Sequence, residues 1–315
     1  MHYIALLGNV DDSITKIKLG EGFTIKRIPM HKFAEMCEEE FIQSDVWPKL
    51  DYEWGCVPPN LYYRPKHVYI IKKDLPDYPK GELKSEDIDK SISFWKTKHA
   101  YEKSISNYIE DKIEKLRLIK EGSIKISIEF FYKETPDGRE MLSSAESSLF
   151  CENRLFSLTT EEIKIANRFL STTPKAKPQK YIQLALENFY LSYQIHHNEF
   201  EFLSLMISLE ALLNDGKTEL RLRVARGCAI LLGHDEQTSR EIFKLARDLY
   251  DKRSVLVHTG DRQKITENDT LSMKDIVRRT LRAALTLNLP KQELSSILLE
   301  SGFGSDPVKK IQLLK

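Results

Sequence analysis

The chain of 315 residues has no apolar run that approaches the roughly 18 residues needed to cross a bilayer. The apolar run at positions 2–8 is short and no basic segment precedes it, so it is interpreted as a first strand and not as a signal peptide. CxxC pairs and zinc-ligand spacings are also missing, because the four cysteines are widely scattered: Cys37, Cys56, Cys151 and Cys228. Buried reduced thiols, a cytoplasmic location and no membrane partner are expected.

A strong excess of either charge is lacking as well. The 48 Lys and Arg residues nearly balance the 47 Asp and Glu residues, which leaves a net charge of +1. A strongly basic chain would bind phosphate backbones indiscriminately, whereas a nearly neutral one needs a local site. With 41% hydrophobic and 30% charged residues, the chain has the composition of a globular protein. Composition by itself does not indicate a function.

The first half of the chain mixes strand and helix patterns. Short alternating or β-branched segments predict strands at 2–8, 14–19, 23–28 and 67–73, and 30–43 predicts a short helix. Four prolines between positions 47 and 65 predict irregular structure there. A long charged helix is expected from Ser85, with apolar positions at helical spacing through Leu116 and its end at Gly122, and a turn signal at 135–138 separates predicted strands at 124–130 and 139–148. The pattern Thr159-Thr160-Glu161-Glu162 opens another helix as a capping box. We therefore predict an α+β N-terminal domain over residues 1–172.

A linker with two prolines and no apolar anchor, residues 171–178, separates this part from a purely helical one. Helical spacing of apolar residues predicts helices at 180–195, 199–213, 217–232, 236–258, 270–288 and 291–300. Residues 199–213 are apolar almost all round, as a central buried helix would be. The second domain, residues 180–315, is thus predicted to be an all-α helical bundle.

The bundle contains the segment Asp251-Lys252-Arg253-Ser254-Val255-Leu256-Val257-His258-Thr259-Gly260. Upstream stand Leu209-Glu210-Ala211-Leu212-Leu213, then Arg221 to Arg226 followed by Ala229-Ile230-Leu231-Leu232, then Leu249-Tyr250. In this order, over about residues 180–285, the chain resembles the Apea-like branch of the HEPN ribonuclease superfamily, whose motif is an Arg, four to six residues and a His. The opening of the chain, around Leu19-Gly20 and Ile25-Lys26-Arg27, resembles more vaguely the leader domain often fused to that branch.

The resemblance implies an RNA endonuclease that needs no metal and no cofactor, with Arg253 and His258 as catalytic residues. In such enzymes the ribose 2′-hydroxyl attacks the adjacent phosphorus and leaves a 2′,3′-cyclic phosphate. An imidazole can exchange protons near neutral pH, and a guanidinium fork can hold a phosphate while negative charge develops. Microbial antiphage defence or a toxin–antitoxin system, with an antitoxin or other regulatory partner, is the expected setting, in which the N-terminal domain would act as a sensor or regulator.

Five positions along an ideal helix amount to about 140 degrees, so Arg253 and His258 do not share a helix face. The two side chains can converge only if the helix ends or distorts near Val257, or if a second subunit completes the site. The resemblance implies pairing of two motifs across a two-fold axis, and we therefore expect a homodimer with a composite cleft.

Each candidate residue also has a structural interpretation. His258 could interact with the carbonyls at a helix end, and Arg253 could belong to an ion pair instead of a phosphate site. Ser254 could orient Arg253 or be a tolerated small residue. A buried ion pair between Glu210 and Arg226 is the favoured interpretation of those two charges. Arg278, Arg279 and Arg282 fit a solvated face better than an RNA contact, and Trp47, Trp54, Tyr62 and Tyr63 fit a core better than a base-stacking surface.

The rival function is a non-catalytic helical module that dimerises or binds RNA or a nucleotide through the same cleft. An ion pair that occupies Arg253 would favour this rival, whereas an accessible Arg and His favour the enzyme.

Overall fold

The computed structural model describes residues 1–36, 47, 50–51, 54, 64–78, 88–136, 138–146, 154–172, 177–216 and 218–309. The chain divides into two compact units, and the main division along the sequence falls after Ser171. The first unit holds all the strands described below, and the second holds the helices from position 180 onward together with the short segment Arg117–Glu121. This division lies inside the linker expected at 171–178.

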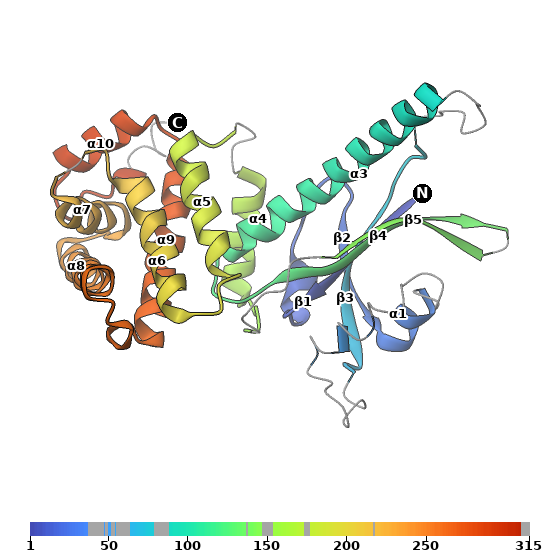
Figure 1. Ribbon diagram of the computed structural model, residues 1–315, viewed down its shortest axis with the longest axis horizontal. Helices are drawn as coiled ribbons and strands as arrows, with labels where there is room; N and C mark the ends of the chain where they lie inside the picture. The colour runs from blue at the N-terminus through green and yellow to red at the C-terminus, as the bar shows by residue number, and fades with distance from the viewer. Residues whose placement is uncertain are drawn as a thin grey trace. The chain divides into compact units, whose positions relative to one another are not determined.

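The first unit is built on a five-stranded antiparallel sheet in the order β2-β3-β1-β4-β5 (Figure 1). Its strands are β1 (His2–Gly8), β2 (Thr24–Pro29), β3 (His67–Asp74), β4 (Lys125–Thr135) and β5 (Gly138–Glu146). β1 is central and nearly all of its residues are buried, which explains its continuous apolar sequence. The strands predicted at 2–8, 23–28, 67–73, 124–130 and 139–148 are therefore confirmed in type over their described residues, and positions 147–148 lie outside these.

Helices cover both faces of this sheet (Figure 1). The short helix α1 (Met30–Met36) places the fully buried Phe33 against a core formed by Ile4, Leu6, Val68, Ile70 and Phe130. The opposite face carries Tyr3, whose hydroxyl donates to Glu129 at 2.7 Å, and the long helix α3 (Ile88–Arg117). Trp47 and Trp54 pack against the α1 side of the core, as the core interpretation requires, whereas Tyr62 and Tyr63 lie outside the described residues.

One predicted strand of this unit is wrong. Residues 14–19 do not form a strand; instead Asp12–Lys16 is a 3₁₀ helix, with the carboxylate of Asp11 accepting from the backbone of Ser13. Ile14 and Ile17 are both buried, and their spacing of three places them on one side of a 3₁₀ turn. The β-branched composition of the segment therefore reflects burial and not strand geometry.

Helix α4 (Thr160–Thr172) closes the first unit along the chain, and its predicted capping box is present. The backbone N–H of Glu162 donates to the Thr159 hydroxyl, while the Glu162 carboxylate accepts from the Thr159 N–H at 2.8 Å. Positions 173–176 of the linker lie outside the described residues.

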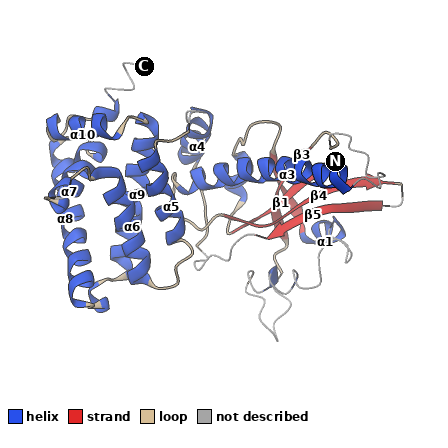
Figure 2. Ribbon diagram, turned by 45° about the horizontal axis from the view of Figure 1, so that its top comes forward, coloured by secondary structure: helices blue, strands red, loops and turns tan. Residues whose placement is uncertain are grey.

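All the secondary-structure elements among the described residues of the second unit are helices, joined by short loops (Figure 2). It consists of α5 (Lys180–Ser192), α6 (Asn198–Leu213), α7 (Leu220–Leu232), α8 (Glu236–Thr259), α9 (Glu267–Leu287) and α10 (Lys291–Glu300), with a 3₁₀ turn at Arg262–Lys264. α6 packs against α5, α7, α8 and α9, so it is the central helix that its all-round apolar sequence predicted. The α+β part followed by a helical part is thereby confirmed.

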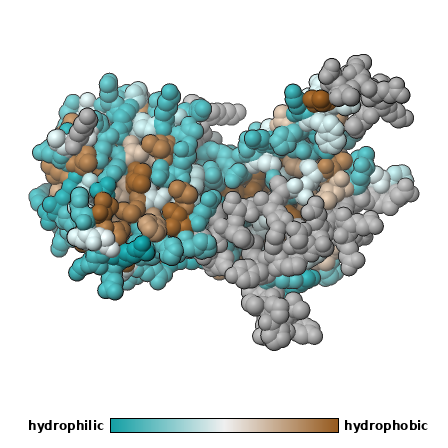
Figure 3. Space-filling model, viewed as in Figure 1, coloured by the Kyte–Doolittle hydropathy of each residue, from teal (hydrophilic) through white to brown (hydrophobic). Residues whose placement is uncertain are grey.

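The surface of the helical unit is not uniformly polar. Figure 3 shows apolar side chains on the face that carries α5 and α6, where Leu184, Leu191, Phe200 and Ile207 are exposed. Cys228 on α7 is a fully buried free thiol, as expected, and the other three cysteines lie outside the described residues. No helix in the described parts of the chain is long and apolar enough to span a membrane.

Candidate functional site

Helix α8 carries the motif, and local sequence explains both of its ends. The carboxylate of Asp235 accepts from the N–H of Thr238, while the Thr238 hydroxyl interacts with the N–H of Asp235, which completes a capping box. Gly260 ends the helix in the left-handed region at φ 70°, a conformation that glycine adopts without a Cβ penalty. Between these caps the helix is continuous, so Arg253, Ser254 and His258 all lie on one regular element.

Three consecutive residues of α8 form ion pairs with three different helices. Asp251 accepts from Arg221 of α7 at 2.5 Å, Lys252 contacts Asp269 of α9 at 2.6 Å, and Arg253 lies 3.6 Å from Glu210 of α6. Successive helical side chains point about 100 degrees apart, which is why neighbours in sequence reach different partners. The segment before His258 is thus held in place from three sides.

Arg253 lies between an acidic and an aromatic side chain. Its guanidinium carbon is 5.7 Å from the centre of the Tyr250 ring, within the range of a cation–π contact. Burial, the charge of Glu210 and a hydrogen bond with Glu210 together raise the pKa of Tyr250 to about 12, against an opposing effect of Arg253. Tyr250 therefore stays protonated near neutral pH, and its uncharged ring contacts the guanidinium of Arg253.

The ion pair leaves Arg253 with unused donors. The 3.6 Å separation from Glu210 Oε1 is longer than a hydrogen bond, and 27% of the Arg253 side chain remains exposed. A guanidinium has five N–H donors, so a ligand oxygen can be bound without removal of Glu210. The expected structural ion pair is present, but it does not occupy the whole fork.

His258 is exposed in the last turn of α8, two residues before the capping glycine. An imidazolium at this position interacts favourably with the partial negative charge of a helix C-terminus. The helix continues through Val257 to Thr259, so the local distortion that could have brought His258 toward Arg253 is not present. Along α8 the two side chains remain about 140 degrees apart.

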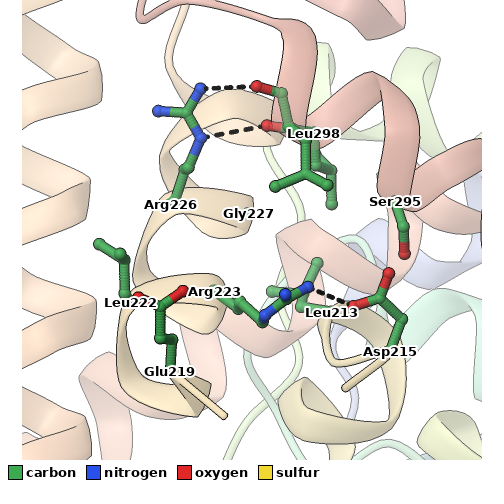
Figure 4. A pocket seen from close by; sticks show the side chains of 10 residues that line it. Leu213, Asp215, Glu219, Leu222, Arg223, Arg226, Gly227, Ser295 and Leu298 are labelled. Carbon is green, nitrogen blue, oxygen red and sulfur yellow. Dashed lines mark hydrogen bonds and ion pairs between the residues drawn. The ribbon is translucent and has the colours of Figure 1, made fainter. Parts of the chain in front are cut away.

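The expected ion pair between Glu210 and Arg226 is wrong. Glu210 faces Arg253, whereas Arg226 donates to the carbonyls of Leu298, Leu299 and Ser301 at the end of α10. Arg226 therefore satisfies helix-terminal acceptors, which are otherwise left without partners. It lines a pocket between α7 and α10 (Figure 4), and its hydrogen bonds go to the end of α10 and not to the motif.

The pocket beside Arg226 is largely apolar. Leu213, Leu222, Gly227 and Leu298 contribute to its wall, and Arg223 pairs with Asp215 across it (Figure 4). An added Cβ at Gly227 would approach Leu213 to 2.9 Å, so the absence of a side chain there lets α7 and the end of α6 approach closely. Neither Arg253 nor His258 lines this pocket.

The expectation of a solvated face for Arg278, Arg279 and Arg282 is also wrong in part. Arg278 is 5% exposed and Arg282 is partly buried, and only Arg279 has substantial exposure. Ser254 is partly buried next to Arg253. Among the described residues, no group of three or more His, Cys, Asp or Glu side chains could hold a metal ion.

Sequence reasoning missed the supporting roles of Tyr250, Lys252 and Asp269. Tyr250 stands three residues before Arg253, a spacing that places both on one helix face, so this contact was detectable from the sequence. The link between Lys252 and Asp269 spans 17 positions and two helices, and no local pattern signals it.

Comparison with family models, with curated proteins and with solved structures finds no significant match to this chain.

Proposed function

We propose that the helical unit carries a metal-independent RNA endonuclease site of HEPN type, formed by Arg253 and His258, acting in the cytoplasm in antiphage defence or a toxin–antitoxin system. The observation that carries this proposal is the state of Arg253: it is held by Glu210 and Tyr250, yet 27% of its side chain is exposed and its guanidinium donates no hydrogen bond to a described residue. A preorganised guanidinium of this kind suits a phosphate on which negative charge develops.

His258 supplies the proton-transfer group in this proposal. Its imidazole is exposed and lies at the end of a capped helix, where a substrate can reach it. It would take the proton of the ribose 2′-hydroxyl or give one to the departing 5′-oxygen, while Arg253 holds the phosphate between them. The O–P bond to the leaving nucleotide breaks as the 2′-oxygen bonds to phosphorus, which yields a 2′,3′-cyclic phosphate and a 5′-hydroxyl.

A homodimer is part of the proposal, because one continuous helix presents the two side chains about 140 degrees apart. Arg253 of one copy and His258 of the other could meet across a two-fold axis. Val255 and Val257, which lie between Arg253 and His258 in the sequence, are 37% and 49% exposed, and burial between two copies would remove these apolar side chains from water.

The second candidate is a non-catalytic module that binds RNA or a nucleotide, or only dimerises, through the same segment. The ion pair between Arg253 and Glu210 favours it, since that pair supplies a structural reason for an arginine at this position. The two candidates differ in one measurable property, the cleavage of RNA.

The test is incubation of the purified full chain with total RNA in the presence of EDTA, followed by analysis of the new ends. The proposal requires cleavage that persists in the chelator and leaves 2′,3′-cyclic phosphate and 5′-hydroxyl ends. An RNA with methylated 2′-hydroxyls should remain intact. Binding of RNA without any cleavage would support the non-catalytic module, and cleavage that EDTA stops would refute the mechanism.

A further inference from the structure

One face of α9 concentrates positive charge without an equal number of carboxylates. Asp275 stands three and four residues before Arg278 and Arg279, and Arg282 stands four and three residues after them, so all four lie within an arc of about 100 degrees. Asp275 accepts from Arg278 at 2.9 Å and pairs with Arg279 at 3.4 Å. Among the residues that the structure describes, no carboxylate forms an ion pair with Arg282. This arginine face, defined as these four residues, therefore carries a net charge of +2.

Two of the three arginines on this face are at least partly buried, and burial makes an uncompensated positive charge energetically costly. The Arg278 side chain is 6% exposed, and its Nη1 is buried without a hydrogen-bond partner in the described part of the chain. Buried donors in proteins nearly always have partners, and an ionised donor is the most costly to leave without one. Burial, followed by the charges of Arg279 and Arg278, lowers the pKa of Arg282, with Asp275 opposing the effect.

Lys274 of the same helix provides an internal comparison. It is as deeply buried as Arg278, but its Nζ lies 2.5 Å from Glu201 of α6 and 4.4 Å from the centre of the Tyr193 ring. The fold thus matches one buried cation of α9 with its own carboxylate. Among the described residues, the three neighbouring arginines share one carboxylate, that of Asp275.

We propose that the arginine face of α9 binds a phosphate group, which bridges the guanidinium groups of Arg279 and Arg282, while the buried guanidinium of Arg278 contributes its positive charge without touching the ligand. A guanidinium fork matches the oxygens of a phosphate, and two uncompensated positive charges match the charge of a phosphate monoester or of two successive phosphodiesters. Arg279 is 38% exposed and Asp275 is 48% exposed, so the ligand can approach from solvent. The site is separate from Arg253 and does not depend on RNA cleavage.

The same chemistry could come from a free phosphate compound or from a polynucleotide backbone, and two probes distinguish them. The first is inorganic pyrophosphate, measured by calorimetry with the full chain. The second is a fluorescent single-stranded DNA oligonucleotide, measured by anisotropy at several salt concentrations; it has no 2′-hydroxyl and cannot be cleaved by the proposed mechanism. Binding of pyrophosphate alone identifies a free phosphate ligand, and binding of the oligonucleotide identifies a backbone ligand.

Arg282→Gln is the main variant, because no carboxylate in the described part of the chain forms an ion pair with Arg282. It should weaken binding of the recognised probe by about tenfold, and it should reduce the salt dependence of oligonucleotide binding by about one charge. Its fold should be at least as stable as that of the unaltered protein without ligand, since a repulsive charge is removed. Asp275→Asn should instead strengthen binding, which a purely structural role for this face does not predict.

Arg240→Gln is the matched control, since Arg240 is an exposed arginine of the same unit, paired with Glu236 four residues away. The proposal is overturned if neither probe binds, or if Arg240→Gln weakens binding as much as Arg282→Gln does. It is also overturned if a polyglutamate peptide of equal charge binds more tightly than both phosphate probes.

Discussion

At the scale of single residues, the two candidate catalytic side chains of the helical unit differ in their surroundings. Arg253 is supported by Tyr250 and Glu210, whereas His258 is exposed and outside the core. A substitution of His258 should therefore affect chemistry with little effect on folding. A substitution of Arg253 removes both a ligand contact and a structural ion pair.

His258→Ala should abolish RNA cleavage and leave the thermal unfolding midpoint nearly unchanged. Loss of a general acid or base typically lowers the rate by about 10²–10⁴. His234→Ala is the matched control, because His234 is also exposed and lies next to a helix cap. The test compares RNA cleavage rates and thermal unfolding curves of the unaltered protein, His258→Ala and His234→Ala. Normal cleavage by His258→Ala would mean that this histidine has a structural role only.

Arg253→Ala should reduce cleavage by at least about 10², the usual effect of removing one donor to a developing charge. Arg253→Lys should recover only part of the activity, because an ammonium cannot reproduce the bidentate fork. Arg247→Ala, which alters an exposed arginine of the same helix, should leave the rate unchanged. Full activity of the lysine variant would contradict a role for the guanidinium geometry.

At the scale of elements, the end of α8 depends on Gly260. Its φ of 70° is unfavourable for an L side chain, although an added Cβ would meet nothing within 4 Å. Gly260→Ala should lower the free energy of unfolding by about 1 kcal/mol through backbone conformation alone. Gly302 also has open space at its Cβ but does not have a positive φ, so Gly302→Ala should have a smaller effect. Equal denaturant midpoints for the two variants would refute this account.

The junction of α8 with α9 should make stability depend on pH in the acid range. Burial favours a raised pKa for Asp269, but hydrogen bonds from Lys252 and Thr266 outweigh it and hold that pKa below its usual value. A carboxyl group with a lowered pKa contributes stability above its unfolded-state pKa, and this contribution disappears as the pH falls through the lower folded-state value.

Asp269→Asn should therefore lower the free energy of unfolding by about 1 kcal/mol at pH 7, and the difference from the unaltered protein should vanish well below about pH 4. Asp248→Asn, on an exposed position of α8, should cause little change at either pH. Urea unfolding of the three proteins at pH 3 and pH 7 measures this. If Asp269→Asn is less stable than the unaltered protein by the same free energy of unfolding at pH 3 and at pH 7, the charge of Asp269 is not the cause of the difference.

At the scale of the whole molecule, the two units differ in how they are built. The first buries a sheet whose central strand pairs with partners distant in sequence, and the second buries helices that follow one another along the chain. The second unit also includes Arg117–Glu121, which precedes the linker by about fifty positions. Arg117 lies 5.5 Å from the centre of the Tyr193 ring of that unit.

A fragment of residues 177–315 should fold alone as a helical domain, but it should be less stable than the same unit in the full chain. It retains α5 to α10 and loses the contact of Arg117 with Tyr193, a cation–π interaction of about 0.5–2 kcal/mol. Helical circular dichroism with a cooperative thermal transition is the expected observation. Limited proteolysis of the full chain should cut first at 171–179. An insoluble or unfolded fragment would argue against an independent helical domain.

Much of the fold could be predicted because the signals are local. Apolar spacing placed α5 to α10, cap residues such as Asp235 and Gly260 marked helix ends, and prolines marked the break after Ser171. The motif itself, with Arg253 and His258 on one helix, was visible in the sequence for the same reason. The segment 14–19 was the exception, because β-branched residues spaced by three suit a buried 3₁₀ turn as well as a strand.

The sequence by itself thus determined the elements, their order and the residues of the motif, since each of these depends on neighbours within a few positions. Only the tertiary structure decided which charges meet. Glu210 pairs with Arg253 and not with Arg226, because α8 presents Arg253 to α6 while α7 presents Arg226 to the end of α10. In the same way, the burial of Arg278 depends on which face of α9 the bundle covers, and ion pairing and burial between helices are set by packing that no local pattern encodes.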